Sequence, residues 1–230
     1  MNKYQLRLCR WLNQPIVTYL FLGLQTLVFL VSYLFPGVIE SQGAMFGPFI
    51  VYYSQYWRFI TPIFIHFGLM HFAVNSVVLY FMGARLEAMY GHLRYFFIYL
   101  LSGIAGNLLS FAFNNAGVQS AGSSTALFGL FGAFVVLGIH YKNNYAIQML
   151  VRQFTLFIGI SLLFNLIDSS VDIWGHIGGL LGGFLLGNIF GLPQRLQDYS
   201  IHIRIIAGLV FIFLVGFCLI YGFKKYQLLV

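Results

Sequence analysis

The stretch that decides the fold is Ser120–Phe134, which reads "SAGSSTALFGLFGAF". Its second half is apolar enough for lipid, yet three consecutive hydroxyl residues, Ser123, Ser124 and Thr125, precede that half. Small residues also recur through the stretch, at Gly122, Ala126, Gly129, Gly132 and Ala133. A membrane helix that combines hydroxyl groups with so many small residues indicates close helix packing beside a polar site.

The composition around this stretch predicts a polytopic membrane protein. The chain has 230 residues, of which 60% are hydrophobic, 19% aromatic and only 7% charged. A soluble domain carries more charge on its surface, and no long polar insert divides the apolar segments. Twelve Lys and Arg residues against five Asp and Glu give a formal net charge of +7. We attribute this balance to membrane topology, and expect no nucleic-acid partner.

Seven apolar segments approach the length that a helix needs to cross a bilayer. They lie at residues 15–35, 69–88, 94–113, 124–140, 147–167, 174–191 and 203–222. The first is expected to be a retained helix, because no small-residue cleavage site follows its basic head. We therefore expect an all-α bundle of seven membrane helices, preceded by a cytoplasmic N-terminal segment at 1–14.

The lysines and arginines predict the orientation of the chain in a plasma membrane. With a cytoplasmic N-terminus, the basic residues on the cytoplasmic side are Lys3, Arg7, Arg10, Arg85, Arg94, Lys142, Arg152, Arg195 and Arg204. Arg58, Lys224 and Lys225 would then lie outside. The bias favours an extracellular C-terminus, although the final lysine pair opposes it.

Polar residues on three of these segments are expected at one depth, because segments two, four and six all begin at the outer surface. His71 and Asn75 are four residues apart and share a helix face. Ser124 and His176 each lie in the first turn of their segments. Any one of these side chains alone is more simply explained as a contact between helices. Four at matching depth predict a functional site, since polar groups in a membrane are costly unless they face one another or water.

Small residues on segments four and six predict that these two helices pack against each other. The stripe on segment six is Gly175, Gly179, Gly183 and Gly187. The facing residues expected on segment four are Gly122, Ala126, Gly129 and Ala133. Such packing would bring Ser124 within hydrogen-bond distance of His176.

A serine beside a histidine is the minimum for nucleophilic catalysis. The imidazole takes the hydroxyl proton during attack and returns it to the leaving amine. Donors for the developing oxyanion could come from the Asn75 amide, a ring N–H of His71 and the backbone N–H of Ser124. The residues therefore predict acyl-transfer chemistry with a Ser124–His176 dyad.

We expect no third catalytic carboxylate, metal or cofactor. Asp168 and Asp172, near the outer end of segment six, are interpreted as loop charges. Cys9 and Cys218 lie at opposite ends of the chain without a metal-ligand spacing. The sequence therefore predicts neither a zinc site nor a disulfide framework.

The order of these motifs resembles that of the rhomboid family of intramembrane serine proteases. The matching pieces are "YWRFITPIFIHFGLMHFAVN", "GSSTALFGLFG" and "GHIGGLLGG", on segments two, four and six. The resemblance runs from about Tyr56 to Gly187. It implies a six-helix catalytic core at 15–191, followed at 192–230 by a connecting loop and one additional, seventh helix.

The resemblance also implies roles for individual residues. Ser124 would be the nucleophile and His176 the base, with His71 and Asn75 as oxyanion donors. The residues expected to give structural support are Gly122, Phe128, Trp57, Arg58, Glu87, Gly179 and Gly183. A further structural role is implied for His66.

Two positions depart from the family pattern. Thr125 stands where the GxSG motif has its last glycine, and it is stiffer and larger than glycine. On a helix its side chain points about 100° away from that of Ser124. Phe128 stands where many relatives have tyrosine, so its ring can pack under the His176 imidazole but cannot donate a hydrogen bond.

These patterns predict an intramembrane serine endopeptidase that cleaves single-pass membrane proteins in the bilayer, near its outer face. The substrate helix must unwind locally, because a helical backbone hides its carbonyl groups. The alternative is a rhomboid-like protein without activity that binds or chaperones membrane helices. A transporter is disfavoured, since midplane charges and internal repeats are missing from the sequence. The natural substrate, the oligomeric state and the role of the seventh helix stay open.

Overall fold

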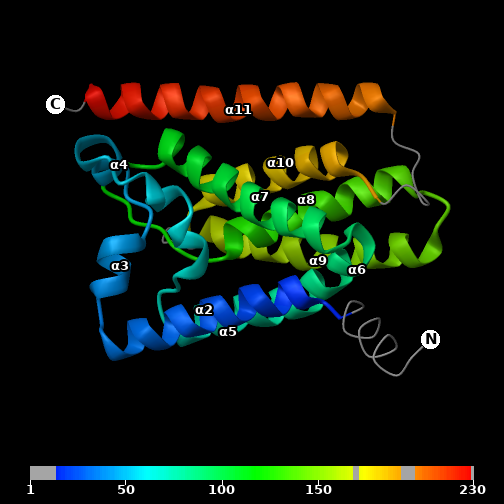
Figure 1. Cartoon of the computed structure of the whole chain (residues 1–230), viewed down its shortest axis with the longest axis horizontal. Coiled ribbons are helices and arrows are strands. Elements are labelled where there is room, and N and C mark those ends of the chain that lie inside the picture. The colour runs from blue at the N-terminus through cyan, green and yellow to red at the C-terminus, as the bar shows by residue number, and fades with distance from the viewer. Residues whose placement is uncertain (1–13, 168–170, 193–199, 229–230) are drawn as a thin grey trace, which may run out of the picture.

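The computed structural model describes residues 14–167, 171–192 and 200–228, which are predominantly helical (Figure 1). Within these ranges, five helices are long and apolar enough to cross a bilayer. They are α2 (Ile16–Leu34), the continuous helix Leu69–Tyr90, α7 (His92–Phe113), α10 (Ile173–Phe190) and α11 (Ile201–Gln227). The predicted class is confirmed: the chain is a helical, multi-pass membrane protein.

The other two predicted segments are helices as well, α8 (Ser124–His140) and α9 (Tyr145–Ile167). The second predicted segment consists of α5 (Leu69–Val78), the π-helical turn η3 (Leu79–Gly83) and α6 (Ala84–Tyr90). The aromatic connection before it folds into α3 (Val38–Gly43), α4 (Gly47–Tyr53), η1 (Tyr56–Phe59) and η2 (Thr61–Phe64). Of the residues discussed above, Lys3, Arg7, Cys9, Arg10, Asp168 and Arg195 lie outside the described residues.

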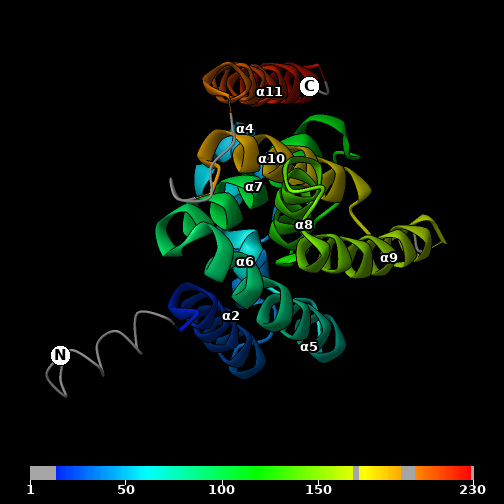
Figure 2. The same cartoon turned by 90° about the vertical axis from the view of Figure 1, so that its right-hand side faces the viewer.

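Helices α7, α8 and α10 form the centre of the bundle (Figure 2). Helices α8 and α10 approach each other backbone to backbone. A Cβ atom added to Gly183 would lie 1.8 Å from the carbonyl oxygen of Gly129, and one added to Gly179 would lie 2.0 Å from that of Thr125. Glycine is therefore required at both positions of α10 for this approach.

Helix α10 carries a second glycine face, which the sequence analysis did not identify. A Cβ atom on Gly178 would lie 2.8 Å from the carbonyl oxygen of Ala105 in α7. The small residues of α8 are likewise divided, because Gly132 lies against the backbone of α10 whereas Ala126 faces α7. The expectation that Ala126 faces α10 is therefore wrong: α8 lies between two helices, and its small residues contact both.

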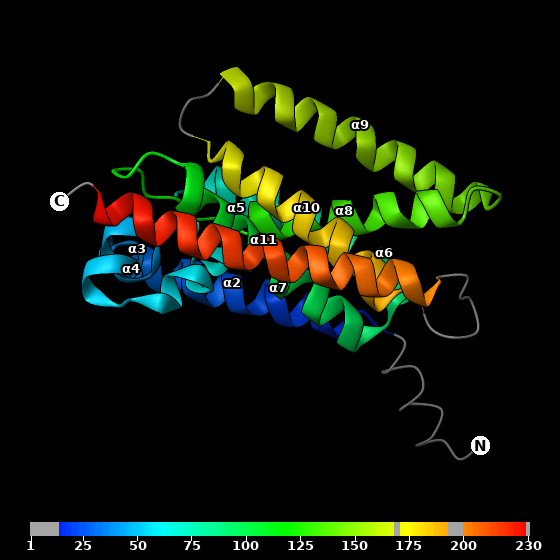
Figure 3. The ribbon, with the colours of Figure 1, turned by 90° about the horizontal axis from the view of Figure 1, so that it is seen from above.

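The outer helices surround this centre. Helices α2 and α5 lie on one side and α11 on the opposite side (Figures 1 and 2), while α9 diverges from the bundle (Figure 3). The Arg204 guanidinium of α11 donates hydrogen bonds to the carbonyl oxygens of Ile189 and Phe190, at 2.8 and 3.3 Å. These are carbonyls of the last turn of α10, where a cation is favourable.

Candidate active site

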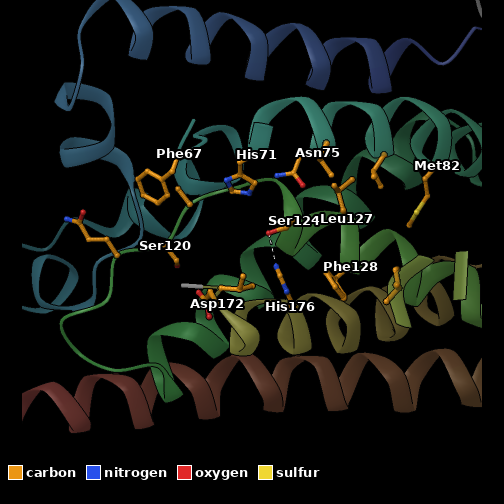
Figure 4. Close-up of a pocket in the computed structure, with 16 residues that line it drawn as sticks. Phe67, His71, Asn75, Met82, Ser120, Ser124, Leu127, Phe128, Asp172 and His176 are labelled. Carbon is orange, nitrogen blue, oxygen red and sulfur yellow. Dashed lines mark hydrogen bonds between the residues drawn. The ribbon is translucent and has the colours of Figure 1, made fainter. Parts of the chain in front are cut away.

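The three consecutive hydroxyl side chains point in three directions, as an advance of about 100° per helical residue requires. Ser124 is the first residue of α8, and its Oγ lies 2.9 Å from Nε2 of His176 (Figure 4). Ser123 is fully buried and lies 3.3 Å from His66. Thr125 is buried between α7 and α10. Ser124 lines the cavity that also contains His176, whereas Ser123 and Thr125 are not part of its lining.

The cavity has a volume of about 510 Å³ and lies between α5 on one side and α8 and α10 on the other (Figure 4). Its polar end holds Gln119, Ser120, Ser124, Asp172, His176, His71 and Asn75. All four residues predicted to carry chemistry therefore line one cavity, and their catalytic roles remain predictions.

The His176 ring is held in place by Phe128. The two rings stack with their centroids 4.2 Å apart and their planes 12° apart. Phe128 lies one helical turn after Ser124, so both side chains project from the same face of α8. The sequence-based expectation of a phenylalanine under the imidazole matches this geometry.

Asp172 also lines the cavity, but its carboxylate is engaged in capping α10. Its Oδ1 accepts the backbone N–H of Gly175 at 2.9 Å, and its Oδ2 accepts the hydroxyl of Ser110 at 2.5 Å. The interpretation as a loop charge is therefore incomplete. The missed signal was an aspartate directly before the apolar run of a helix, a preferred N-cap residue.

The opposite wall of the cavity carries the two predicted oxyanion donors on α5 (Figure 4). Nδ2 of the buried Asn75 has no hydrogen-bond partner among the described residues. The His71 ring lies over Gly122, where an added Cβ atom would be 2.7 Å from Cε1 of His71. Gly122 also has a φ of +141°, so the residue must be glycine for two reasons. The amide of Ser124 lies in the first turn of α8, where backbone N–H groups have no intrahelical acceptor.

His66 is hydrogen-bonded to Ser123, the residue directly before the nucleophile. Its side chain is 2% exposed, and its Nε2 accepts the backbone N–H of Ser123 at 3.4 Å. Burial, assisted by the nearby His71, lowers the pKa of His66 to about 3. The imidazole is therefore neutral near pH 7 and can accept this hydrogen bond.

Arg58 and Trp57 organise the connection between α2 and α5. The Arg58 side chain is fully buried and donates to the carbonyl oxygens of Ala44 and Ser41, both at 2.6 Å. The Trp57 indole donates to the carbonyl oxygen of Gln42 at 3.0 Å. Both side chains thus tie η1 to α3, away from the cavity.

Glu87 lies in α6 and caps the start of α2. Its carboxylate accepts the backbone N–H groups of Val17 and Thr18, at 2.9 and 2.8 Å, and the Thr18 hydroxyl at 2.7 Å. The ring of His92 contacts the same carboxylate. This arrangement satisfies the free N–H groups of a helix terminus with a negative charge.

The apolar end of the cavity was not identified from the sequence. It is lined by Val74, Val78, Met82, Leu127, Phe128 and Ile158. A signal was available, because Val74, Val78 and Met82 continue the face of His71 and Asn75 at helical spacing. The partner walls come from α8 and α9, and no local pattern indicates which helices lie opposite.

Comparison with known proteins shows which family the chain is similar to. The model of the Rhomboid domain family matches residues 53–193, which is more than half of the chain. The rhomboid protease GluP of Bacillus subtilis is 35% identical over 186 residues, which cover 79% of this chain and 36% of that protein. RHOMBOID-like protein 1 of Arabidopsis thaliana is 38% identical over 153 residues, 66% of this chain and 39% of that protein.

A fungal relative extends the range of organisms. Rhomboid-type serine protease 2 of Emericella nidulans is 36% identical over 149 residues, covering 63% of this chain and 29% of that protein. The chain therefore spans between about three and four tenths of the length of these three relatives.

Proposed function

The chain belongs to the rhomboid family, and we propose that it is an intramembrane serine endopeptidase with Ser124 as nucleophile and His176 as general base. The observation that carries the proposal is the 2.9 Å distance between Ser124 Oγ and His176 Nε2 inside a cavity. A nucleophile and a base within hydrogen-bond distance are the minimum for covalent catalysis of acyl transfer.

The first chemical step is attack by Ser124 Oγ on the scissile carbonyl carbon while His176 Nε2 takes the hydroxyl proton. The resulting oxyanion is stabilised by three donors: a ring N–H of His71, the Asn75 amide and the backbone N–H of Ser124. The unpartnered Nδ2 of Asn75 supports this assignment, because a donor without a partner in the free enzyme is available to the intermediate. Collapse of the intermediate expels the amine, which receives the proton from His176.

The second step hydrolyses the acyl-enzyme. A water molecule attacks the ester carbon and gives a proton to His176. The same donors stabilise the oxyanion of the second tetrahedral intermediate. The leaving Ser124 oxygen regains its proton from the imidazole. Phe128 supports the orientation of His176 through both steps, because its ring stacks on the imidazole.

The substrates we propose are single-pass transmembrane proteins, cleaved near the outer membrane face. The polar end of the cavity adjoins the loop before α8, whereas its apolar end extends along α5 toward Met82. An extended, unwound segment of a substrate helix fits such a cavity, since a helical backbone has no free carbonyl for attack. Small or helix-breaking residues are therefore the expected preference at the cleaved bond.

The membrane placement completes the proposal. Residues 15–191 form the catalytic core, 1–14 a cytoplasmic segment, and 192–230 the connection and the last helix. The positive-inside bias supports a plasma-membrane protein with a cytoplasmic N-terminus and an extracellular C-terminus.

Cleavage of a model single-pass substrate by the reconstituted protein tests the proposal. Wild type is compared with Ser124→Ala, His176→Ala and the control Ser123→Ala, which removes the adjacent buried hydroxyl. We expect the first two variants to lose about 10³-fold or more in kcat, while Ser123→Ala still cuts. Cleavage that survives Ser124→Ala would contradict the assigned nucleophile. A folded wild type that cuts none of several substrates would instead favour the inactive, helix-binding alternative.

A further inference from the structure

The last turn of α11 contacts two elements, the C-terminal end of α7 and helix α4. The Lys225 ammonium donates to the carbonyl oxygen of Asn114 and, at 3.5 Å, to that of Phe111. These carbonyls lie at the C-terminal end of α7. A cation there donates to carbonyls without an intrahelical partner and interacts favourably with the helix dipole. The loop that follows this end leads directly to the nucleophile.

Tyr226, the next residue, is inserted between α7 and α4. Its ring is 2% exposed and stacks on Phe111, with centroids 5.3 Å apart and planes 12° apart. A Cβ atom on Gly47 would lie 2.0 Å from the Tyr226 hydroxyl oxygen, so glycine is required for the ring to fit. The Tyr52 hydroxyl of α4 donates to the Tyr226 carbonyl oxygen at 2.7 Å.

The segment directly before α4 is in turn hydrogen-bonded to the loop that positions the nucleophile. Met45, two residues before Gly47, forms a β-bridge with Ser120: the N–H of Met45 donates to Ser120 at 2.8 Å, and that of Ser120 donates back at 3.1 Å. The N–H of Gly122 donates to the carbonyl oxygen of Pro62 at 2.9 Å. The loop before Ser124 is thus held at its start, at Asn114, and near its end, at Ser120 and Gly122.

We propose that Lys225 and Tyr226 make the end of α11 a positioning element of the active site. They hold the end of α7 and helix α4, and through the Met45–Ser120 bridge they fix the loop that places the hydroxyl and the backbone N–H of Ser124. This assignment rests on the proposed protease function. It gives the seventh helix a role in the geometry of the reaction beyond membrane anchorage.

This role has a physical basis: in a close-packed interior, a shift of one element displaces the elements in contact with it. A close-packed interior does not absorb the loss of a buried ring, so the neighbouring elements shift. A displacement of about 1 Å at a nucleophile can cost about 100-fold in rate. The contacts pass from Tyr226 through α4 to Ser120, four residues before the nucleophile.

The test uses the full-length protein in lipid and two matched pairs of variants. Lys225→Ala is paired with Lys224→Ala, because Lys224 is the exposed neighbour on the same turn. Tyr226→Ala is paired with Tyr226→Phe, which keeps the stacked ring. Lys225→Arg, which retains a cationic donor, is the rescue variant.

Two measurements are made on each variant: amide hydrogen exchange at Ser120 and Gly122, and kcat and KM for a model substrate. Lys225→Ala and Tyr226→Ala are expected to speed exchange at both amides about tenfold and to lower kcat about tenfold, with KM changed less than about twofold. Lys224→Ala, Tyr226→Phe and Lys225→Arg are expected to behave as wild type.

Unchanged exchange in Lys225→Ala and Tyr226→Ala would overturn the proposal, and so would an equal effect from Lys224→Ala. A loss expressed only in KM would also overturn it, because positioning of the nucleophile acts on the chemical step. If wild type itself cuts no substrate, the protease function fails, whereas hydrogen exchange still decides whether α11 holds the loop.

Discussion

The two walls of the active-site cavity are held in different ways. Ser124 and His176 belong to helices whose backbones are in contact, since an added Cβ on Gly179 or Gly183 would meet a carbonyl oxygen of α8 at 2.0 or 1.8 Å. His71 and Asn75 belong to α5, which lies across the cavity from α8 and has far fewer contacts with it.

Helix α5 is held from behind by α2. The rings of Phe29 and Phe72 stack with centroids 4.4 Å apart, and Nε2 of the buried Gln25 donates to Oγ of Ser76 at 2.9 Å. Phe72 and Ser76 of α5 are not among the residues that line the cavity, so α5 depends on side-chain contacts with a peripheral helix.

The nucleophile and base therefore form one rigid unit, while the two side-chain oxyanion donors, His71 and Asn75, form a second unit that can be perturbed separately. Backbone contact between α8 and α10 leaves no room for rotamer adjustment, because the contacting atoms are main-chain atoms. Side-chain contacts between α2 and α5 can repack. Changes in the first unit should therefore cost stability and activity together, and changes in the second should separate them.

The largest effect is expected from Gly183→Val, which breaks the rigid unit. The new side chain would collide with the backbone of α8, so we expect a loss of about 4 kcal/mol or more in the free energy of unfolding. Activity should disappear with the fold. Gly208→Val on α11 is the matched control, because a Cβ atom there meets nothing within 4 Å. Thermal unfolding in detergent measures both, and equal midpoints would contradict the backbone-contact argument.

A smaller, purely kinetic effect is expected from Asn75→Ala in the second unit. Removing one oxyanion donor typically lowers kcat by about 10²–10³-fold. The stability should stay within about 0.5 kcal/mol of wild type, because Nδ2 has no partner to lose among the described residues. Kinetics and unfolding of the same preparation check this.

Ser76→Ala provides the contrast for Asn75→Ala on the same helix. It breaks the hydrogen bond to Gln25 and should destabilise the protein by about 1 kcal/mol, with a smaller effect on kcat. If Asn75→Ala proves as destabilising as Ser76→Ala, Asn75 is a structural residue and the separation of the two units is wrong.

The packing of the rigid unit was easier to predict from the sequence than the surroundings of the second unit on α5. Glycines at every fourth residue can be identified along one helix, and their close approach to a neighbour follows from the absence of a side chain. To predict the residues that line the cavity, one must know which helices lie opposite α5. Ile158 of α9, for example, lines the cavity without any local sign. The π-helical turn η3 likewise lies inside a uniformly apolar run.

Charge was the second place where sequence reasoning fell short. Lys225 opposed the positive-inside prediction, but its ammonium caps the carbonyl end of α7 instead of lying free at the surface. A cation used to cap a helix carries less information on topology than a solvated one. The interpretation of Asp172 was incomplete for a different reason: its N-cap position directly before α10 could be identified locally, whereas its contact with Ser110 of α7 could not.

The smallest effect concerns Thr125, the departure from the family motif, which lies in the seam of the rigid unit. Its side chain packs against Gly106 and Gly175, where added Cβ atoms would lie 2.8 and 3.1 Å from its carbon atoms, so the missing side chains of both glycines make room for it. Its hydroxyl is buried without a hydrogen-bond partner among the described residues. Thr125→Val keeps the shape and removes this unpaired group.

We therefore expect Thr125→Val to raise the free energy of unfolding by about 1 kcal/mol and to leave kcat within about twofold of wild type. Thr125→Ala, which removes the methyl group as well, should be less stable than Thr125→Val. Loss of activity in Thr125→Val without loss of stability would mean that the hydroxyl acts in the chemistry. The rigid unit would then contain a second functional hydroxyl. The two units would differ in the chemical groups that they contribute to the reaction as well as in how they are packed.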